Sequence, residues 1–191
     1  MNKSAFIVGL VLAAVARGSA QVAIEILLEQ EEFLRSESLP LKVRLVNSSG
    51  QALRLGEDAD WLSFGIQNLE GHTVQRLGRV PAADAFTLGS SKVASLQTDL
   101  MPYFDLSVPG RYTVTVAAKI PQLNQTFSSK PTGFEIVGGT KLWEREFGVP
   151  SAGVPEVRKY ALQQATFLKQ LRLYVRLTDP PEQKVFRVLP L

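Results

Sequence analysis

Apolar and polar residues alternate with a period of two along residues 22–28 and again along residues 39–45. Successive side chains of an extended chain reach opposite faces, so this period predicts β-strands with one buried face. Short runs of the same kind follow as far as residue 137, with little helical periodicity between them. The predicted strands are residues 22–28, 39–45, 53–55, 61–68, 73–77, 92–100, 111–117 and 132–137. About seven short strands at this spacing favour a β-sandwich.

Turn-forming residues separate these runs. Asn47–Gly50 ends the second run with residues that tolerate positive φ, and Gly71 lies between two strand-like runs, as in a hairpin. Pro109-Gly110 precedes the run that contains Tyr112. The sequence therefore predicts an all-β sandwich over residues 21–138, with its loops gathered at two ends.

A second segment is predicted over residues 139–191. Residues 157–168 are compatible with a helix or a strand, whereas residues 171–177 alternate as a strand and residues 184–189 begin another. We favour a β-meander, with a helix followed by a hairpin as the alternative. Two or three strands are too few for a stable sandwich. The segment is therefore expected to pack on the first domain or to begin a truncated second domain.

The first twenty residues are typical of an export signal. Lys3 gives a positive start, residues 5–16 form an uncharged apolar stretch, and Gly18-Ser19-Ala20 supplies small residues for cleavage. A membrane span would need about 20 apolar residues, so we predict a signal peptide over residues 1–20. Ala14-Val15-Ala16 is an alternative cleavage site. We expect a periplasmic or extracellular protein without a membrane span after signal removal.

Signal removal also changes the charge balance. The whole chain has a formal net charge of +3, and loss of Lys3 and Arg17 leaves 19 basic against 18 acidic residues. A nearly neutral chain gives no electrostatic reason to expect nucleic acid, so we predict no nucleic-acid partner. The chain contains no cysteine, which excludes disulfides, thiolate metal sites and cysteine nucleophiles. For an exported protein, this favours a bacterial periplasm or exterior.

Several motifs resemble those of a bacterial immunoglobulin-like domain: Glu37, Leu41–Asn47, Gly50, Trp61–Gln67, Gly71 and Pro109–Tyr112. Their order is also similar to the domain type named for a Bacillus proteinase inhibitor. The chain further resembles secreted proteins of environmental bacteria whose role is unassigned. The resemblance implies an immunoglobulin-like sandwich in which the Tyr112 hydroxyl bonds back to the preceding loop, a tyrosine corner. A shared fold does not carry a function with it.

We find no catalytic constellation and predict that the protein is not an enzyme. His72 is the only histidine and is expected to be an exposed turn residue. A serine triad needs a histidine and usually a G-x-S-x-G elbow, while a catalytic zinc needs several protein ligands. Glu57, Asp58 and Asp60 are weak candidates for calcium, which binds clustered oxygen ligands, but solvated charges are commoner. We assign no catalytic, cofactor-binding or metal-binding residue.

Two further groups combine residue types that bind ligands in other proteins. Five aromatic residues are candidates for a sugar-binding platform: Trp61, Phe64, Tyr103, Phe104 and Tyr112. In a sandwich such residues more often fill the core, and we expect Trp61 to anchor it and Tyr103 and Phe104 to be exposed. The second group mixes basic and aromatic residues and is more typical of a solvated strand face than of a nucleic-acid face. Its members are Lys169, Arg172, Tyr174 and Arg176.

These observations favour an exported, non-catalytic interaction module. It would bind another envelope or extracellular protein through sandwich loops or a strand edge. The candidate loops are residues 47–50, 57–60, 79–91 and 122–129. A polysaccharide-binding accessory domain of a secreted enzyme is the alternative, and proteinase inhibition follows from the resemblance alone. Burial of Trp61, Phe64 and Tyr112 would count against sugar binding.

Overall fold

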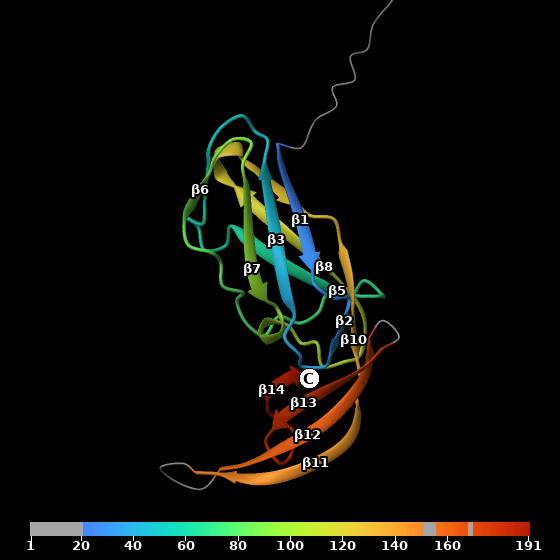
Figure 1. Cartoon of the computed structure of the whole chain (residues 1–191). Coiled ribbons are helices and arrows are strands. Elements are labelled where there is room, and N and C mark those ends of the chain that lie inside the picture. Colours follow the sequence, from blue (N-terminus) through green and yellow to red (C-terminus); the bar gives the residue numbers. More distant parts are fainter. Residues whose placement is uncertain (1–20, 151–155, 168–169) are drawn as a thin grey trace, which may run out of the picture.

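The computed structural model describes residues 21–150, 156–167 and 170–191. In these ranges the chain is almost entirely β-structure, with two short 3-10 turns, η1 (Met101–Tyr103) and η2 (Pro121–Leu123). The predicted signal peptide, residues 1–20, lies outside the described residues, as do residues 151–155 and Lys169. Figure 1 shows one body built from the strands before residue 138, and a curved sheet across its end built from those after it.

One sheet of the first body has three antiparallel strands in the order β1-β3-β7. They are β1 (Val22–Leu28), β3 (Pro40–Asn47) and β7 (Val93–Asp99). Along the central strand β3, Leu41, Val43 and Leu45 are buried while Lys42 between them is exposed. The period-two pattern of residues 39–45 thus corresponds to one face turned to the core.

The second sheet has the order β2-β10-β8-β5, and β9 pairs with β8 beside it. β2 runs parallel to β10, and the other pairs are antiparallel. A separate two-stranded sheet joins β4 to β6. The bounds are β2 (Glu32–Leu34), β4 (Leu53–Leu55), β5 (Leu62–Asn68), β6 (Phe86–Leu88), β8 (Gly110–Ile120), β9 (Gln125–Ser128) and β10 (Thr132–Val137).

Both large sheets contribute to one hydrophobic core. Val43 of β3, Ile66 of β5 and Val114 of β8 belong to the same buried cluster and have no exposed surface. Burial of this kind supplies most of the favourable free energy of folding in a chain without disulfides. The predicted all-β class is therefore confirmed.

Three short strands were not predicted, and one predicted strand is reduced to isolated bridges. β2, β6 and β9 are three or four residues long, too short for a period-two pattern to show. Their pairing depends on partners elsewhere in the chain, because β2 joins β10 about a hundred residues later. The expected strand at residues 73–77 forms only the bridges Gln67–Thr73 and Arg76–Phe104.

The hydrogen bond implied by the resemblance at Tyr112 is present. The Tyr112 hydroxyl donates to the backbone carbonyl of Val108 over 2.6 Å. The Tyr112 ring stacks on Phe134 with 5.6 Å between ring centroids, and Phe134 meets Phe33 edge-on. These contacts fix the entry of the chain into β8, the longest strand of its sheet.

The segment after residue 139 forms a four-stranded antiparallel sheet in the sequential order β11-β12-β13-β14. Its strands are β11 (Thr140–Val149), β12 (Glu156–Phe167), β13 (Gln170–Thr178) and β14 (Val185–Pro190). The residues that were compatible with a helix or a strand therefore lie in a strand. No helix in the described ranges is long and apolar enough to cross a membrane.

A small second core joins this sheet to the first body. Leu34 of β2 packs in it with Ala165, Tyr174 and Val188 from β12, β13 and β14. Gly139 lies at the same joint, where a Cβ atom would come within 2.8 Å of Leu34 Cδ1. Gly139 is thus a point of close approach between the two parts, and a larger residue there would require the Leu34 side chain to shift.

Candidate interaction surface

The side chains of β12 and β13 give the sheet one face of mixed polar and apolar character and one that is largely apolar. The face toward the first body, called the inner face here, buries the polar side chains of Gln163, Arg176 and Thr178. The opposite face, called the outer face, carries Leu162 and the apolar residues of β13: Leu171, Leu173, Val175 and Leu177. An antiparallel sheet with one covered face normally turns its apolar side chains inward.

The inner face makes a chain of polar contacts with the first body. Arg176 Nη1 donates to the carbonyl of Arg35, and Arg172 Nη1 donates to Gln30 Oε1, each over 3.4 Å. Gln30 in turn donates to Glu37. Burial lowers the pKa of the Arg176 guanidinium, with the nearby Arg35 adding to the effect. These contacts hold the sheet at a defined orientation on the sandwich.

This arrangement corrects the prediction for the basic and aromatic residues of β13. Arg172, Tyr174 and Arg176 were expected on a solvated face, but they point into the junction, and Tyr174 is only 2% exposed. The burial of Tyr174 raises the pKa of its hydroxyl. Alternation along β13 defines two faces of the strand but does not indicate which face is covered. The packing of Leu34 against Tyr174 determines that the face with arginine and tyrosine is the covered one.

Glu37 gives the junction a pH dependence that can be measured. Burial raises the pKa of the Glu37 carboxyl above its ordinary value of 4.5, although Leu34 N–H and Gln30 donate to it and Arg172 is nearby. A raised folded-state pKa contributes stability below about pH 4.5, and this contribution is lost as pH rises through the folded pKa. We therefore expect Glu37→Gln to gain stability relative to the native chain as pH rises over this window.

Urea unfolding of the native chain and the Glu37→Gln variant across about pH 4 to 8 measures this difference. Glu31→Gln, at an exposed position, is the matched control. A stability difference between the native chain and Glu37→Gln that stays constant with pH would contradict the assignment.

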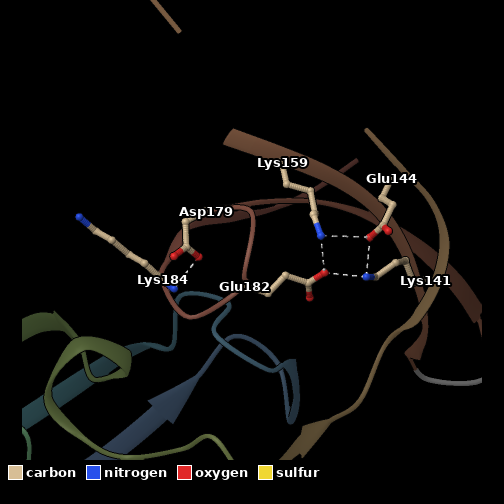
Figure 2. Close-up of polar contacts among 6 residues, drawn as sticks. All are labelled: Lys141, Glu144, Lys159, Asp179, Glu182 and Lys184. Atoms are coloured by element: carbon tan, nitrogen blue, oxygen red, sulfur yellow. Dashed lines mark hydrogen bonds and ion pairs between the residues drawn. The ribbon is translucent and has the colours of Figure 1, made fainter. Parts of the chain in front are cut away.

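An ion-pair network on the inner face links β11 and β12 to the turn after β13 (Figure 2). Lys141 Nζ lies 2.6 Å from Glu144 Oε2 and 2.7 Å from Glu182 Oε1, and Lys159 Nζ lies 3.2 Å from the same Glu182 oxygen. Hydrogen bonds from Lys141 lower the pKa of both carboxyls. The network therefore anchors the turn between β13 and β14 on β11 and β12, and its opposite charges balance one another.

The outer face carries two rows of side chains that cross all four strands in register. One row is entirely apolar: Trp143, Leu162, Val175 and Leu189. The neighbouring row places an arginine at each margin: Arg145, Tyr160, Leu177 and Arg187. Trp143 is 54% exposed and Leu189 46%, and Phe147 extends the surface by stacking on Tyr160 with 4.3 Å between centroids.

The charge of the outer face is positive. Among the described residues, no carboxylate lies within ion-pair distance of Arg145 or Arg187. Glu156, at the end of β12, is paired with Arg158 at 3.0 Å. The Arg158 guanidinium also lies over the Phe186 ring, 4.7 Å from its centroid. The two marginal arginines of the second row are thus available to a partner.

The five aromatic residues that were candidates for a sugar-binding platform do not form one. Trp61, Phe64 and Tyr112 are buried in the core, which counts against sugar binding through them. Phe104 was expected to be exposed with Tyr103, and this is wrong: Phe104 is buried and Tyr103 is partly buried. Residues 101–103 form the η1 turn, after which Phe104 enters the core beneath the Arg76 guanidinium, 5.7 Å from its ring centroid.

The acidic residues that were candidates for calcium and the single histidine lie in different local environments and form no common site. Asp58 accepts the Asp60 backbone N–H, and Asp60 pairs with Arg79 at 2.8 Å, so these carboxylates serve local contacts. In the part of the chain that the structure describes, no group of three or more His, Cys, Asp or Glu side chains could hold a metal ion. His72 is exposed beside Glu70 in its turn, as predicted.

Comparisons with known proteins give little. No family model matches the sequence, and no curated protein matches it. Among solved structures the chain is similar to the Pseudomonas fluorescens alkylpurine DNA glycosylase AlkC bound to DNA containing an abasic site analog, with a TM-score of 0.42 and 18% identity. The match covers 62% of this chain and 31% of that chain, so it spans about a third of the glycosylase chain.

This similarity contradicts two predictions, that the chain is not an enzyme and that it has no nucleic-acid partner. Both are withdrawn. The prediction of no nucleic-acid partner used the net charge of the whole mature chain, which does not reveal local groups of arginines such as those on the outer face. The prediction of no enzymatic activity used missing motifs, and a missing motif excludes only the chemistries that depend on it. A TM-score of 0.42 carries no functional argument, so neither glycosylase activity nor DNA is assigned to this chain.

Proposed function

We propose that this protein is an interaction module that binds another protein through the outer face of the β11–β14 sheet. The observation that supports this most directly is the largely apolar outer face of β12 and β13, opposite an inner face that buries several polar groups. Polar groups are buried in the junction while leucine, valine, tyrosine and tryptophan side chains face outward. A sheet of this kind is favoured when its outer face is also covered.

The inner face is mixed, because Ala165 and Tyr174 are buried beside the polar side chains of Gln163 and Arg176. Gln163 Oε1 and Arg176 Nε are buried without a hydrogen-bond partner among the described residues. An unsatisfied buried polar group costs about 1–3 kcal/mol. Burying an exposed leucine- or tryptophan-sized side chain against a partner returns roughly 1.5–3 kcal/mol. A partner at the outer face would therefore add apolar burial that the free chain lacks there.

In this proposal, residues 21–138 form an immunoglobulin-like domain that supports the sheet. The two sheets around one core and the Tyr112–Val108 hydrogen bond support that assignment. The loops considered from the sequence become secondary to the sheet face. We also propose that the protein is exported, because residues 1–20 have the pattern of a signal peptide. An exported module would meet envelope or extracellular proteins.

Site-specific photo-crosslinking tests the proposed face. A benzophenone amino acid replaces Trp143, or replaces Leu69 as a control, because Leu69 is an exposed apolar residue on the first body. We expect a discrete protein adduct from position 143 and none from position 69. The adduct protein, identified by mass spectrometry and then purified, should bind the native chain directly.

A double variant, Trp143→Ser with Leu189→Ser, separates binding from folding. Both side chains are about half exposed, so the melting temperature should change little, while affinity for the identified partner should fall by more than about tenfold. Equal adducts from positions 143 and 69, or unchanged affinity in the double variant, would refute the proposal.

A further inference from the structure

We infer that the partner's contact surface is apolar at its centre and carries acidic side chains at two margins; this inference rests on the proposed function. The outer face defines the pattern. Arg145 and Arg187 lie at opposite ends of one row, on the two edge strands, with Tyr160 and Leu177 between them. A complementary surface therefore has apolar groups flanked by carboxylates.

The sheet geometry sets the spacing of those carboxylates. Arg145 lies on β11 and Arg187 on β14, three strand intervals apart in the order β11-β12-β13-β14. Neighbouring strands are about 4.8 Å apart, so the two arginine backbones are separated by roughly 14 Å across the sheet. The partner's acidic groups should span a similar distance, with the apolar contact between them.

Desolvation makes the acidic groups necessary. When a partner covers Tyr160 and Leu177, the adjoining guanidiniums of Arg145 and Arg187 lose water. A charge that loses water without a counter-charge is strongly unfavourable, whereas a carboxylate forms short bidentate hydrogen bonds with arginine. A surface with neutral or basic margins would therefore be rejected by the same residues that attract an acidic one.

The charge pattern disfavours a second copy of this chain. Neither row of the outer face contains a carboxylate. Because a two-fold interface brings the same patch of both copies together, it would bring four arginines to one contact with no acid opposite them. The acidic partner is therefore a different protein.

The aliphatic residues favour protein over nucleic acid. Single-stranded nucleic acids bind through successive aromatic rings on which bases stack. Besides the rings of Trp143, Phe147 and Tyr160, the outer face carries Leu162, Val175 and Leu177 on its two central strands. These aliphatic positions interrupt the series of rings that stacked bases would need. Aliphatic side chains at the centre and arginine at the margins match a desolvated protein interface with charged rims.

Binding of two designed peptides to the full chain tests the inference. The peptides are amphipathic helices with the same leucine face, and the positions that flank this face on both sides carry either glutamate or lysine. We expect saturable binding of the glutamate peptide, about tenfold or more tighter than the lysine peptide. The double variant Arg145→Glu with Arg187→Glu should reverse this preference. Lys42→Glu with Lys130→Glu makes the same change of charge on the first body and should leave the preference intact.

The outcomes separate this inference from the proposed function. If the native chain bound both peptides equally and the Trp143→Ser variant bound neither, the preference for acidic partners would be refuted. The outer face would still be a binding surface. Absence of peptide binding, or a preference unaffected by the arginine variants, would also refute the inference. Tighter binding of a thymidine oligonucleotide or of phosphatidylglycerol vesicles would replace the protein partner with nucleic acid or membrane. Dimerisation of the native chain through Trp143 would indicate a second copy.

Discussion

Replacing Tyr174 with serine is expected to lower the free energy of unfolding by about 3–5 kcal/mol. Replacing the adjacent Val175 with serine should lower it by about 1 kcal/mol or less. Tyr174 fills the small core against Leu34 and Val188, where removing an aromatic ring leaves a cavity. Val175 lies on the outer face, where its side chain is partly exposed in the free chain. Two neighbouring residues of one strand should thus differ widely because they face opposite sides.

Urea unfolding of both variants measures the difference, and hydrogen exchange of β13 shows where the loss occurs. With Tyr174→Ser, the amides of β12–β14 should exchange faster while those of β3 remain protected, because the first body has its own core. Val175→Ser should instead weaken partner binding. Equal destabilisation by the two variants would mean that the outer face is packed in the free protein, and would remove the basis of the proposed function.

Trp61→Ala should unfold the first body at room temperature or leave it marginal, with a loss of about 3–5 kcal/mol, while Trp143→Ala should cost less than about 1 kcal/mol. Trp61 is 2% exposed and meets Phe86 edge-on at 6.1 Å between centroids. Trp143 projects from the outer face of β11. These are the two tryptophans of the chain, so each serves as the control for the other.

Intrinsic fluorescence reports on the two sites separately once one tryptophan is replaced by phenylalanine. The emission of Trp61 in Trp143→Phe should be blue-shifted, because its indole is excluded from water, and should respond to unfolding. The emission of Trp143 in Trp61→Phe should be red-shifted and move to the blue when a partner covers the outer face. Partner-dependent emission from Trp61 and none from Trp143 would place the binding surface on the first body instead.

The two pairs of variants rest on the same physical distinction. A residue buried within the chain contributes to folding, and its loss appears in the unfolding transition. An apolar residue that is exposed in the free chain contributes little to folding, and its loss appears in binding. Trp61 and Tyr174 belong to the first class, and Trp143 and Val175 to the second.

The local pattern of the sequence was sufficient for the long strands and the fold class. Residues 22–28 and 132–137 alternate in sequence and form β1 and β10 with the expected bounds, because period-two patterning is a local property of an extended chain. Burial of Trp61 was likewise expected, and the bond from Tyr112 to the preceding loop was implied by the resemblance to an immunoglobulin-like domain. The short strand β2 was not, because its only pairing is with β10, far along the chain.

The binding surface itself depended on the tertiary structure. The alternation along residues 171–177 was enough to predict a strand with a leucine-rich face and a face carrying arginine and tyrosine. It could not determine which face meets the first body, because a period of two is the same from either side. Only the packing of Leu34 and Gly139 against this sheet decided that Tyr174 points inward and that the apolar row through Trp143 and Leu189 points outward.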